Sequence, residues 1–311
     1  MHSRGLSGIS LCLLWTLSLQ WSLPVRRTKR RTSPRTSSRL HQQARPFDAS
    51  DPPPLTLLIP AYNEEFRIGE TLHACDDFLS SSDLWKDRSR ILVVDDGSVD
   101  DTVRVVEEFT SRSSAVPLEC LRLTPNQGKG AALAAGMRAC PNDGLILTTD
   151  ADGSAELDGL HVLYPKLTDL IDDWSQPALV SGYRTYADAS ALRLIFRWGF
   201  RTVVKTVCGD LGVKDSQCGF KLMTAPAAKL LYDDLNLPGW SHDVEVLYRA
   251  RELKIPVVEE DIVWEDKPGS KLVASPGGVI AVCAKMFWEV VRLRWGYERG
   301  EWKLPSGSLT S

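Results

Sequence analysis

Closely paired cysteines are missing from this sequence of 311 residues. The seven cysteines are scattered along the chain, and none of them lies in a CxxC pair. This absence argues against a disulfide framework and against a zinc site, so a reducing compartment is the simpler interpretation. Cys218 lies in a polar stretch, and we expect it to be a packed thiol and not a reactive one.

The glycine-rich fingerprints of two large nucleotide-binding classes are missing as well. The first strand-like run, residues 55–60, continues into Ala-Tyr-Asn-Glu and not into GxGxxG, and the chain contains no Walker loop. The absence of both motifs argues against a dehydrogenase and against a P-loop ATPase.

Positive charge is scarce in the body of the chain. Residues 51–311 hold 28 basic and 39 acidic residues, a net charge of −11, whereas residues 1–50 carry nine basic residues and one acidic residue. An acidic body argues against a nucleic-acid-binding surface, so no nucleic acid is expected as a partner. With 43% hydrophobic residues, the chain is expected to form one domain of about 200–250 residues with appendages.

An apolar segment opens the chain. No charged residue occurs between Gly5 and Val25, and a cluster of arginines and lysines follows directly. The length of the segment lies between that of a signal-peptide core and that of a transmembrane helix. Basic flanks favour a body that faces the cytosol. We predict an uncleaved anchor over residues 1–25, with a signal or an organelle transit peptide as the alternatives, and a basic flexible linker over residues 26–54.

From residue 55 onward, short runs rich in β-formers alternate with stretches of helical periodicity. The strand-like runs span residues 55–60, 91–94, 117–123 and 145–149, and the helical stretches span residues 64–79, 102–112 and 131–140. Three βα units followed by a fourth strand predict an α/β fold. The first half of this fold is expected to be of the nucleotide-binding type.

Acidic residues follow three of these strand-like runs. Glu64 follows the first, Asp95 and Asp96 follow the second, and Asp150 and Asp152 follow the fourth. Ligands of parallel sheets bind beyond the carboxyl ends of the strands. Carboxylates gathered there repel one another unless a cation lies between them, so the pattern predicts a divalent metal with a phosphorylated ligand.

The spacing of Asp150 and Asp152 makes this pair the predicted metal site. Residues at i and i+2 of an extended stretch point to the same side, so both carboxylates can share one cation. Their hard oxygens suit Mg²⁺ or Mn²⁺, and the oxygens of a nucleotide diphosphate would complete an octahedron. A solvated acidic turn is the alternative.

Two further motifs allow both a binding and a structural interpretation. Asp95 and Asp96 can accept hydrogen bonds from a nucleobase or a ribose, whereas Ser98 and Asp101 resemble a capping box for the following helix. Lys129 lies between glycines at the start of a helix, where its ammonium group and the exposed N–H groups favour phosphate. A surface lysine is the alternative.

Eight short motifs, in a fixed order, resemble those of known enzyme families. PAYNEE, VVDDGSVDDT, NQGKGAAL and TTDADGS resemble the family-2 glycosyltransferases of the GT-A fold. SGYR, DSQCGFKLM, WSHDVEVLY and PGSKL, in the second half of the chain, resemble the dolichyl-phosphate β-glucosyltransferases. The match covers about residues 55–295. It implies a GT-A catalytic domain over residues 55–275, with a Rossmann-like mixed sheet flanked by helices.

The resemblance also implies an activity and a site. The activity would be transfer of glucose from UDP-glucose to dolichyl phosphate, with inversion at the anomeric carbon, at the endoplasmic reticulum membrane during N-glycan precursor assembly. The nucleotide would be bound by Pro60, Ala61, Tyr62, Glu64, Asp95, Asp96, Lys129, Asp150 and Ala151. Asp150 and Asp152 would hold the metal and the diphosphate, and Arg184, Arg193 and Lys271 would hold the acceptor phosphate.

The motif WSHDVEVLY departs from the family's usual Trp-Ala-Phe-Asp-Val-Glu. His242 stands at the position of the phenylalanine, and we expect an exposed, inert imidazole. For Asp243 we expect a role in positioning the sugar. A lipid phosphate is already an anion at neutral pH, so it needs little deprotonation, unlike a sugar hydroxyl.

Two basic and apolar segments are predicted to contact the lipid bilayer. In residues 191–207, Arg193, Arg197, Arg201 and Lys205 recur every four residues, along one face of a helix. Residues 279–295 combine apolar side chains with three basic ones, and residues 276–311 are predicted to be an amphipathic, membrane-associated segment and tail. Ordinary core helices are the alternative.

The sequence is also compatible with other activities. The enzyme alternatives are mannosyl transfer from GDP-mannose to dolichyl phosphate and transfer to a hydroxyl acceptor, which would need Asp243 as a true base. A sugar-nucleotide-binding protein without activity is the alternative of another class. The intact Asp150, Asp152 and Lys129 count against it.

Overall fold

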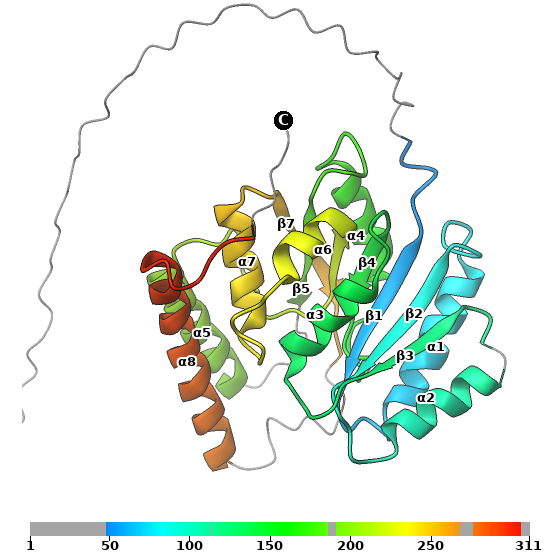
Figure 1. Ribbon diagram of the computed structural model, residues 1–311, viewed down its shortest axis with the longest axis horizontal. Coiled ribbons are helices and arrows are strands. Elements are labelled where there is room, and N and C mark those ends of the chain that lie inside the picture. Colours follow the sequence, from blue (N-terminus) through cyan, green and yellow to red (C-terminus); the bar gives the residue numbers. More distant parts are fainter. Residues whose placement is uncertain (1–47, 113, 186–190, 266, 268–275, 306–311) are drawn as a thin grey trace, which may run out of the picture. The chain divides into compact units, whose positions relative to one another are not determined.

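The computed structural model of the chain describes residues 48–112, 114–185, 191–265, 267 and 276–305 (Figure 1). The chain divides into two units, Met1–Arg45 and Pro46–Ser311, and all described residues belong to the second. The predicted N-terminal anchor, most of the predicted linker and Lys271 lie outside the described residues. Over the ranges that are described, none of the helices combines the length and the apolar character that a membrane crossing needs.

Seven strands form one mixed sheet in the order β3-β2-β1-β4-β6-β5-β7. The strands are β1 (Leu55–Ala61), β2 (Ser89–Asp95), β3 (Leu118–Arg122), β4 (Leu145–Thr148), β5 (Leu179–Thr185), β6 (Lys221–Thr224) and β7 (Val257–Val263). Neighbouring strands are parallel except at β6, which runs antiparallel to both β4 and β5. The four strands predicted from the sequence and the expected mixed sheet are confirmed.

Helices cover both faces of this sheet (Figure 1). On one face lie α1 (Ile68–Ser81), α2 (Thr102–Ser111) and α4 (Gly159–Thr168). On the other face lie α3 (Lys129–Ala139), α6 (Ala225–Tyr232) and α7 (His242–Glu252). The remaining pair, α5 (Ala191–Cys208) and α8 (Pro276–Glu298), packs together beside α7.

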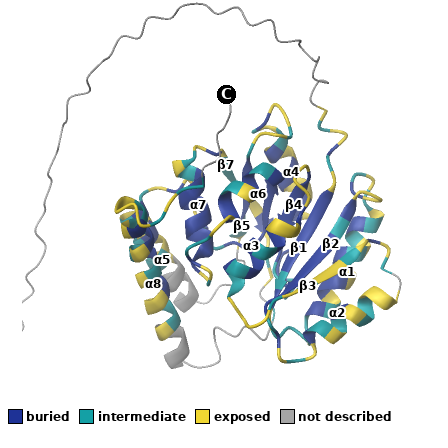
Figure 2. Ribbon diagram, in the orientation of Figure 1, coloured by how far each residue is buried: buried dark blue, intermediate teal, exposed yellow. Residues whose placement is uncertain are grey.

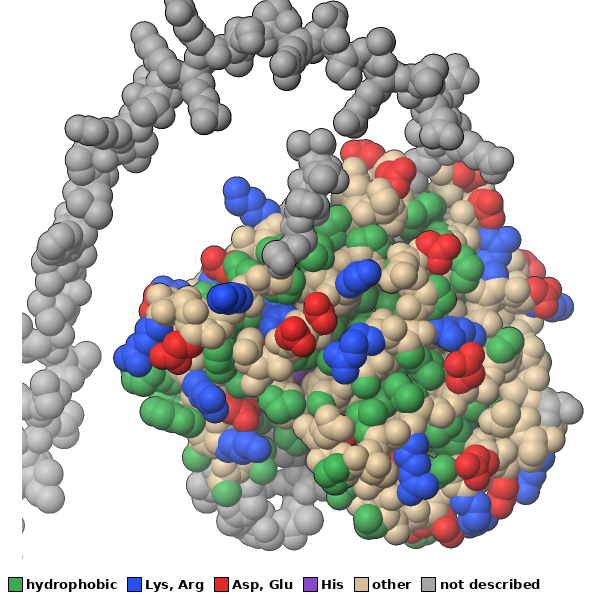
Figure 3. Space-filling view, in the orientation of Figure 1, with side chains coloured by type: hydrophobic (Ala, Val, Ile, Leu, Met, Phe, Trp, Pro, Cys, Tyr) green, Lys and Arg blue, Asp and Glu red, His purple; other side chains and the backbone are tan. Residues whose placement is uncertain are grey.

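Alternation along the central strands explains why both faces are covered. In β1, Leu57 and Ile59 belong to the core that α1 completes, whereas Leu58 between them packs with α3 on the other face. All three side chains are fully buried, and the central strands are dark blue in Figure 2. A strand that is buried on both faces needs a nearly continuous apolar run, and residues 55–60 provide one. On the face of the molecule that Figure 3 shows, acidic and basic side chains are interspersed.

The start of α1 lies later than predicted. It begins at Ile68 and not near Glu64, because residues 64–67 form a turn that is tied to the loop after β2. The backbone N–H of Glu64 donates to the Thr102 hydroxyl at 2.6 Å, and the N–H of Glu65 donates to the Asp100 carboxylate at 3.3 Å. These long-range bonds hold the turn outside the helix.

The predicted capping box at α2 is wrong. The Ser98 hydroxyl accepts the N–H of Asn63 at 2.8 Å, and Asp101 makes no side-chain capping bond. The carboxylate of Asp100 instead accepts the N–H of Thr102 at 3.0 Å. Ser98 therefore joins the ends of β1 and β2, and Asp100, two residues further along, supplies the acceptor at the helix start.

Candidate active site

Three strand ends meet at one edge of the sheet. Ala61, the last residue of β1, pairs with Asp95, the last residue of β2. Asp150 follows β4, the strand on the other side of β1. Pro60 and Tyr62 flank Ala61 at this edge, and Tyr62 is partly exposed. The parallel register thus brings together the strand ends that carry the predicted nucleotide site.

Asp95 and Asp96 both have protein partners. Asp95 is fully buried, accepts the N–H of Ser98 at 3.2 Å, and lies 3.5 Å from the guanidinium group of Arg122. Asp96 accepts the N–H groups of Gln127 and Gly128 at 2.8 and 2.7 Å. Asp96 therefore shapes the loop that leads into Lys129, a structural task that the motif did not reveal.

Lys129 pairs with the first carboxylate of the predicted metal site. It is the first residue of α3, and its Nζ lies 2.5 Å from Asp150 Oδ1 and 5.6 Å from the ring centroid of Trp240. Burial works against its charge, but Asp150 and Asp243 raise the pKa of Lys129, so the ammonium form persists. The ammonium group supplies the cation that the clustered carboxylates need.

Asp152 lies beside a second cation. Its Oδ1 accepts the N–H of Ser154 at 3.0 Å, and its Oδ2 lies 3.7 Å from the Nη1 atom of Arg67. Glu64 holds Arg67 bidentately at 2.7 and 2.8 Å. Glu64 and Asp152, from different strand ends, thus share one guanidinium group. Arg67 stands outside the acidic motifs, so no local pattern in the sequence points to it.

A helix hydroxyl fixes the backbone between Asp150 and Asp152. Thr71 of α1 is buried, and its hydroxyl donates to the Ala151 carbonyl at 2.9 Å. On the other side, the Gly219 backbone lies so close that a Cβ there would meet Asp150 Oδ1 at 2.6 Å. The two carboxylates are therefore presented by a loop that is held from both sides.

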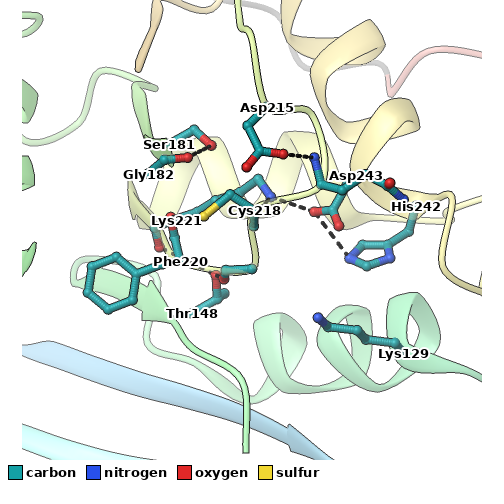
Figure 4. Close-up of polar contacts among 12 residues, drawn as sticks. Lys129, Thr148, Ser181, Gly182, Asp215, Cys218, Phe220, Lys221, His242 and Asp243 are labelled. Atoms are coloured by element: carbon teal, nitrogen blue, oxygen red, sulfur yellow. Dashed lines mark hydrogen bonds and ion pairs between the residues drawn. The ribbon is translucent and has the colours of Figure 1, made fainter. Parts of the chain in front are cut away.

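Asp243 is a buried carboxylate between a lysine and an imidazole. It lies in the first turn of α7, 2.5 Å from the Nζ of Lys221 and 3.4 Å from the Nε2 of His242 (Figure 4). Burial opposes its ionisation, but His242, Lys221 and Lys129 together lower the pKa of Asp243. A carboxylate with a lowered pKa is a weak base, which suits a positioning role better than proton removal.

The expectation of an exposed imidazole at position 242 is wrong. His242 is 1% exposed, and its ring lies between Asp243 and the first turn of α3 (Figure 4). A Cβ on Gly130 would meet His242 Cβ at 2.5 Å, so the two helices touch at this point. The side chain points inward because α7 packs its first turn against α3, a contact that the local sequence does not encode.

The predicted acceptor residues are described only in part. Asp215 holds the guanidinium group of Arg184 bidentately, at 2.7 and 2.9 Å, and the Trp264 ring centroid lies 5.1 Å from Arg184 Cζ. The side chain of Arg193 and the whole of Lys271 lie outside the described residues. Arg184 is therefore the one predicted acceptor residue whose side chain the described part of the chain places.

The packed thiol predicted at Cys218 is confirmed. Cys218 is fully buried, and its Sγ atom lies 3.9 Å from the Phe220 carbonyl oxygen. Burial raises the pKa of the thiol to about 12. A thiol that stays protonated at neutral pH is a poor nucleophile.

The donor set at Asp150 and Asp152 fits a hard divalent cation that is shared with a ligand. Among the described residues, no group of three or more His, Cys, Asp and Glu side chains is arranged to hold a metal alone. Two carboxylates leave coordination positions for phosphate oxygens. Asp150 also contacts the ammonium group of Lys129, so a bound cation would share this carboxylate with the lysine.

Solved structures share this fold. Glucosyl-3-phosphoglycerate synthase from Mycobacterium tuberculosis matches with a TM-score of 0.56 and 19% identity, over 80% of this chain and 82% of that one. Mannosyl-3-phosphoglycerate synthase from Rubrobacter xylanophilus matches with a TM-score of 0.56 and 14% identity, over 82% of this chain and 78% of that one. The fold is the GT-A fold, and the protein is of the glycosyltransferase class that this fold serves.

Sequence comparisons define the family more narrowly. The model of glycosyl transferase family 2 matches residues 56–224. A dolichyl-phosphate β-glucosyltransferase of Dictyostelium discoideum is 33% identical over 264 residues, which are 81% of this chain and 77% of the relative. The human enzyme of the same name is 32% identical over 261 residues, 80% of this chain and 78% of the relative. The chain therefore belongs to glycosyl transferase family 2 and, within it, to the dolichyl-phosphate β-glucosyltransferases.

Proposed function

We propose that the protein transfers glucose from UDP-glucose to dolichyl phosphate, forming dolichyl β-D-glucosyl phosphate for N-glycan precursor assembly. The names of the curated relatives support the sugar and the acceptor. The observation that carries the proposal is the meeting of Asp150, Asp152 and Lys129 beyond β4. Two carboxylates and one ammonium group are what a metal-bound diphosphate needs.

The side chains of this site have to bring two anions together. Lys129 and Arg67 offer positive charge beside Asp150 and Asp152, where the diphosphate of the donor would lie. Arg184, whose orientation Asp215 fixes, is assigned to the acceptor phosphate. Catalysis would then rest on positioning and electrostatic stabilisation, since the acceptor oxygen is already ionised.

For the cofactor we propose Mg²⁺ or Mn²⁺, held by Asp150 and Asp152 together with diphosphate oxygens. The structure of the mycobacterial glucosyl-3-phosphoglycerate synthase is a complex with Mn²⁺ and UDP, which supports a divalent cation in this fold. When bound, the cation would neutralise the charge that develops on the departing diphosphate.

For the location we propose the endoplasmic reticulum membrane, with the catalytic domain facing the cytosol. The basic residues that directly follow the apolar segment 5–25 support this orientation. A second contact with the bilayer would come from α8 and α5, which expose the large apolar side chains Trp198, Phe287, Trp288 and Trp295. Exposed aromatic side chains together with basic ones suit the headgroup layer.

The test is a lipid-extraction assay with radiolabelled UDP-glucose and dolichyl phosphate, with and without a chelator. We expect label in the lipid phase only when the metal is present, and roughly a hundredfold or greater loss in Asp150→Asn. Asp143→Asn, an exposed residue before β4, is the matched control and should keep full activity. Normal product formation by Asp150→Asn would contradict the role of this carboxylate.

The same assay separates the alternatives. Turnover of GDP-mannose without turnover of UDP-glucose would favour the mannosyl reaction. Label on a glycan hydroxyl and complete loss of activity in Asp243→Asn would favour a hydroxyl acceptor, because only that reaction needs a base. UDP binding without any transfer would indicate a sugar-nucleotide-binding protein.

A further inference from the structure

Both ring nitrogens of His242 face oxygen atoms. Nδ1 lies 2.8 Å from the Gly239 carbonyl oxygen, and Nε2 lies 3.4 Å from Asp243 Oδ1. Nε2 is buried and makes no hydrogen bond within the described part of the chain. The buried imidazole of His242 therefore has one nitrogen in a hydrogen bond and one nitrogen that makes no hydrogen bond to the described residues.

The number of protons on this ring decides which contacts are favourable. A neutral imidazole carries one N–H, whereas a carbonyl oxygen and an ionised carboxylate can only accept. With the proton on Nδ1, the bond to Gly239 is made and the lone pair of Nε2 faces Asp243. Only the doubly protonated ring offers a donor to both oxygens.

The surroundings of the ring oppose this second proton in the free protein. Burial comes first, followed by two ammonium groups, Lys129 on α3 and Lys221 on β6, and these effects lower the pKa of His242. The start of α7, where His242 is the first helical residue, adds the positive end of the helix dipole. Asp243 acts in the opposite direction, and the hydrogen bond to the Gly239 carbonyl adds a smaller effect that also raises the pKa of His242.

Binding of an anion at Lys129 would change this balance. His242 touches the first turn of α3 through Gly130, next to Lys129, and Lys129 is the cation assigned to the donor diphosphate. A nucleoside diphosphate carries more negative charge than one divalent cation neutralises, so the bound complex would still offset the positive potential of the lysine at the ring. The effect of Asp243 on the pKa of His242 would then outweigh the others. The ring would gain a proton and donate a hydrogen bond to Asp243.

We infer, on the basis of the proposed function, that His242 is a positioning residue that takes up a proton from solvent when a nucleoside diphosphate binds beside Lys129. The imidazolium ring then joins Gly239 to Asp243 and holds the carboxylate in place. His242 acts through Asp243 and not on the substrate itself. Because a proton is bound together with the ligand, affinity for the diphosphate should increase as the pH falls through the neutral range.

The test is calorimetric titration of the full-length protein with UDP and Mg²⁺ in two buffers of different ionisation enthalpy at neutral pH. We expect the wild type to take up close to one proton more than His242→Phe does. His161→Asn, an exposed histidine on α4, is the matched control and should match the wild type. Equal proton uptake in wild type and His242→Phe, with UDP bound by both, would overturn the inference.

A second measurement on the wild type does not depend on a variant. The ¹⁵N spectrum of the imidazole groups reports the protonation state of each of the five histidines. We expect one buried ring to change from the neutral to the doubly protonated form when UDP and Mg²⁺ are added. An unchanged protonation state of this ring in the UDP-bound protein would contradict the inference. Failure to bind UDP at all would contradict the proposed function instead.

The pH dependence of the kinetics distinguishes positioning from a purely structural role. In the wild type, the KM for UDP-glucose should fall as the pH is lowered from about 8 to about 6, around the ordinary pKa of histidine. In His242→Phe this slope should be lost. A KM that is raised by the same factor at every pH would indicate packing alone and would contradict proton-linked positioning.

Discussion

Thr71 shows how a single hydroxyl can determine the geometry of the candidate metal site. It lies on α1, far from Asp150 and Asp152 in the sequence, and its bond to the Ala151 carbonyl joins residues 80 positions apart. The carbonyl lies between the two carboxylates that are assigned to the metal. Loss of this bond would leave a buried acceptor without its donor and would release the loop.

At the scale of residues we therefore expect Thr71→Val to lower kcat/KM by roughly tenfold, since a lost hydrogen bond of about 1–2 kcal/mol would relax the metal loop. The measurement is the steady-state rate of glucosyl transfer. Thr110→Val is the matched control, because the Thr110 hydroxyl makes a comparable bond to Val106 O at 2.9 Å on α2. Equal losses in both variants would contradict a specific role for Thr71.

At the scale of elements, α7 serves two functions along its length. Its first turn carries His242 and Asp243 at the site. A fully buried ion pair joins Glu245 of the same turn to Arg249 one turn further along, at 2.8 Å. The Tyr297 hydroxyl of α8 donates to Glu245 at 2.9 Å. This pair anchors α7 to α8 and so keeps the first turn of α7 in position.

We expect Arg249→Met to reduce the free energy of unfolding by about 3–5 kcal/mol, because it leaves the buried carboxylate of Glu245 without its cationic partner. Urea unfolding followed by circular dichroism measures the loss. The control is Arg104→Met, which breaks an exposed pair with Glu108 on α2 and should change stability little. A similar stability for both variants would show that the buried pair is not the anchor.

At the scale of the whole molecule, α5 and α8 pack against each other beside α7 and form a flank outside the sheet (Figure 1). Trp288 and Trp295 of α8 are 58% and 47% exposed, and their ring centroids lie 6.1 Å apart. Paired exposed aromatic rings are costly in water and favourable at a membrane interface. This flank is the surface that we propose for the contact with the bilayer.

We expect lipids with brominated acyl chains to quench the tryptophan fluorescence of the full-length protein in vesicles, and Trp288→Phe or Trp295→Phe to lose part of this quenching. The physical reason is that the quencher acts only on rings that enter the acyl boundary. Trp174→Phe, next to Tyr164 on the sheet domain, serves as the control. Quenching that is lost equally in all three variants would contradict a bilayer contact at α8.

Local patterns in the sequence determined a large part of this protein. Apolar runs such as residues 55–60 and 145–149 predict strands because burial on both faces demands them. The acidic residues after these runs predict a site because parallel strands end at a common edge. Asp95 and Asp150 could therefore be placed together before any contact was known.

The tertiary structure alone decided how those groups are paired. The bonds from Lys129 to Asp150 and from Lys221 to Asp243 join residues 21 and 22 positions apart, and His242 is buried only because α7 meets α3. The antiparallel insertion of β6 between β4 and β5 brings Lys221 to Asp243. Short-range periodicity encodes which face of an element is apolar, whereas these contacts depend on how separate elements pack against one another.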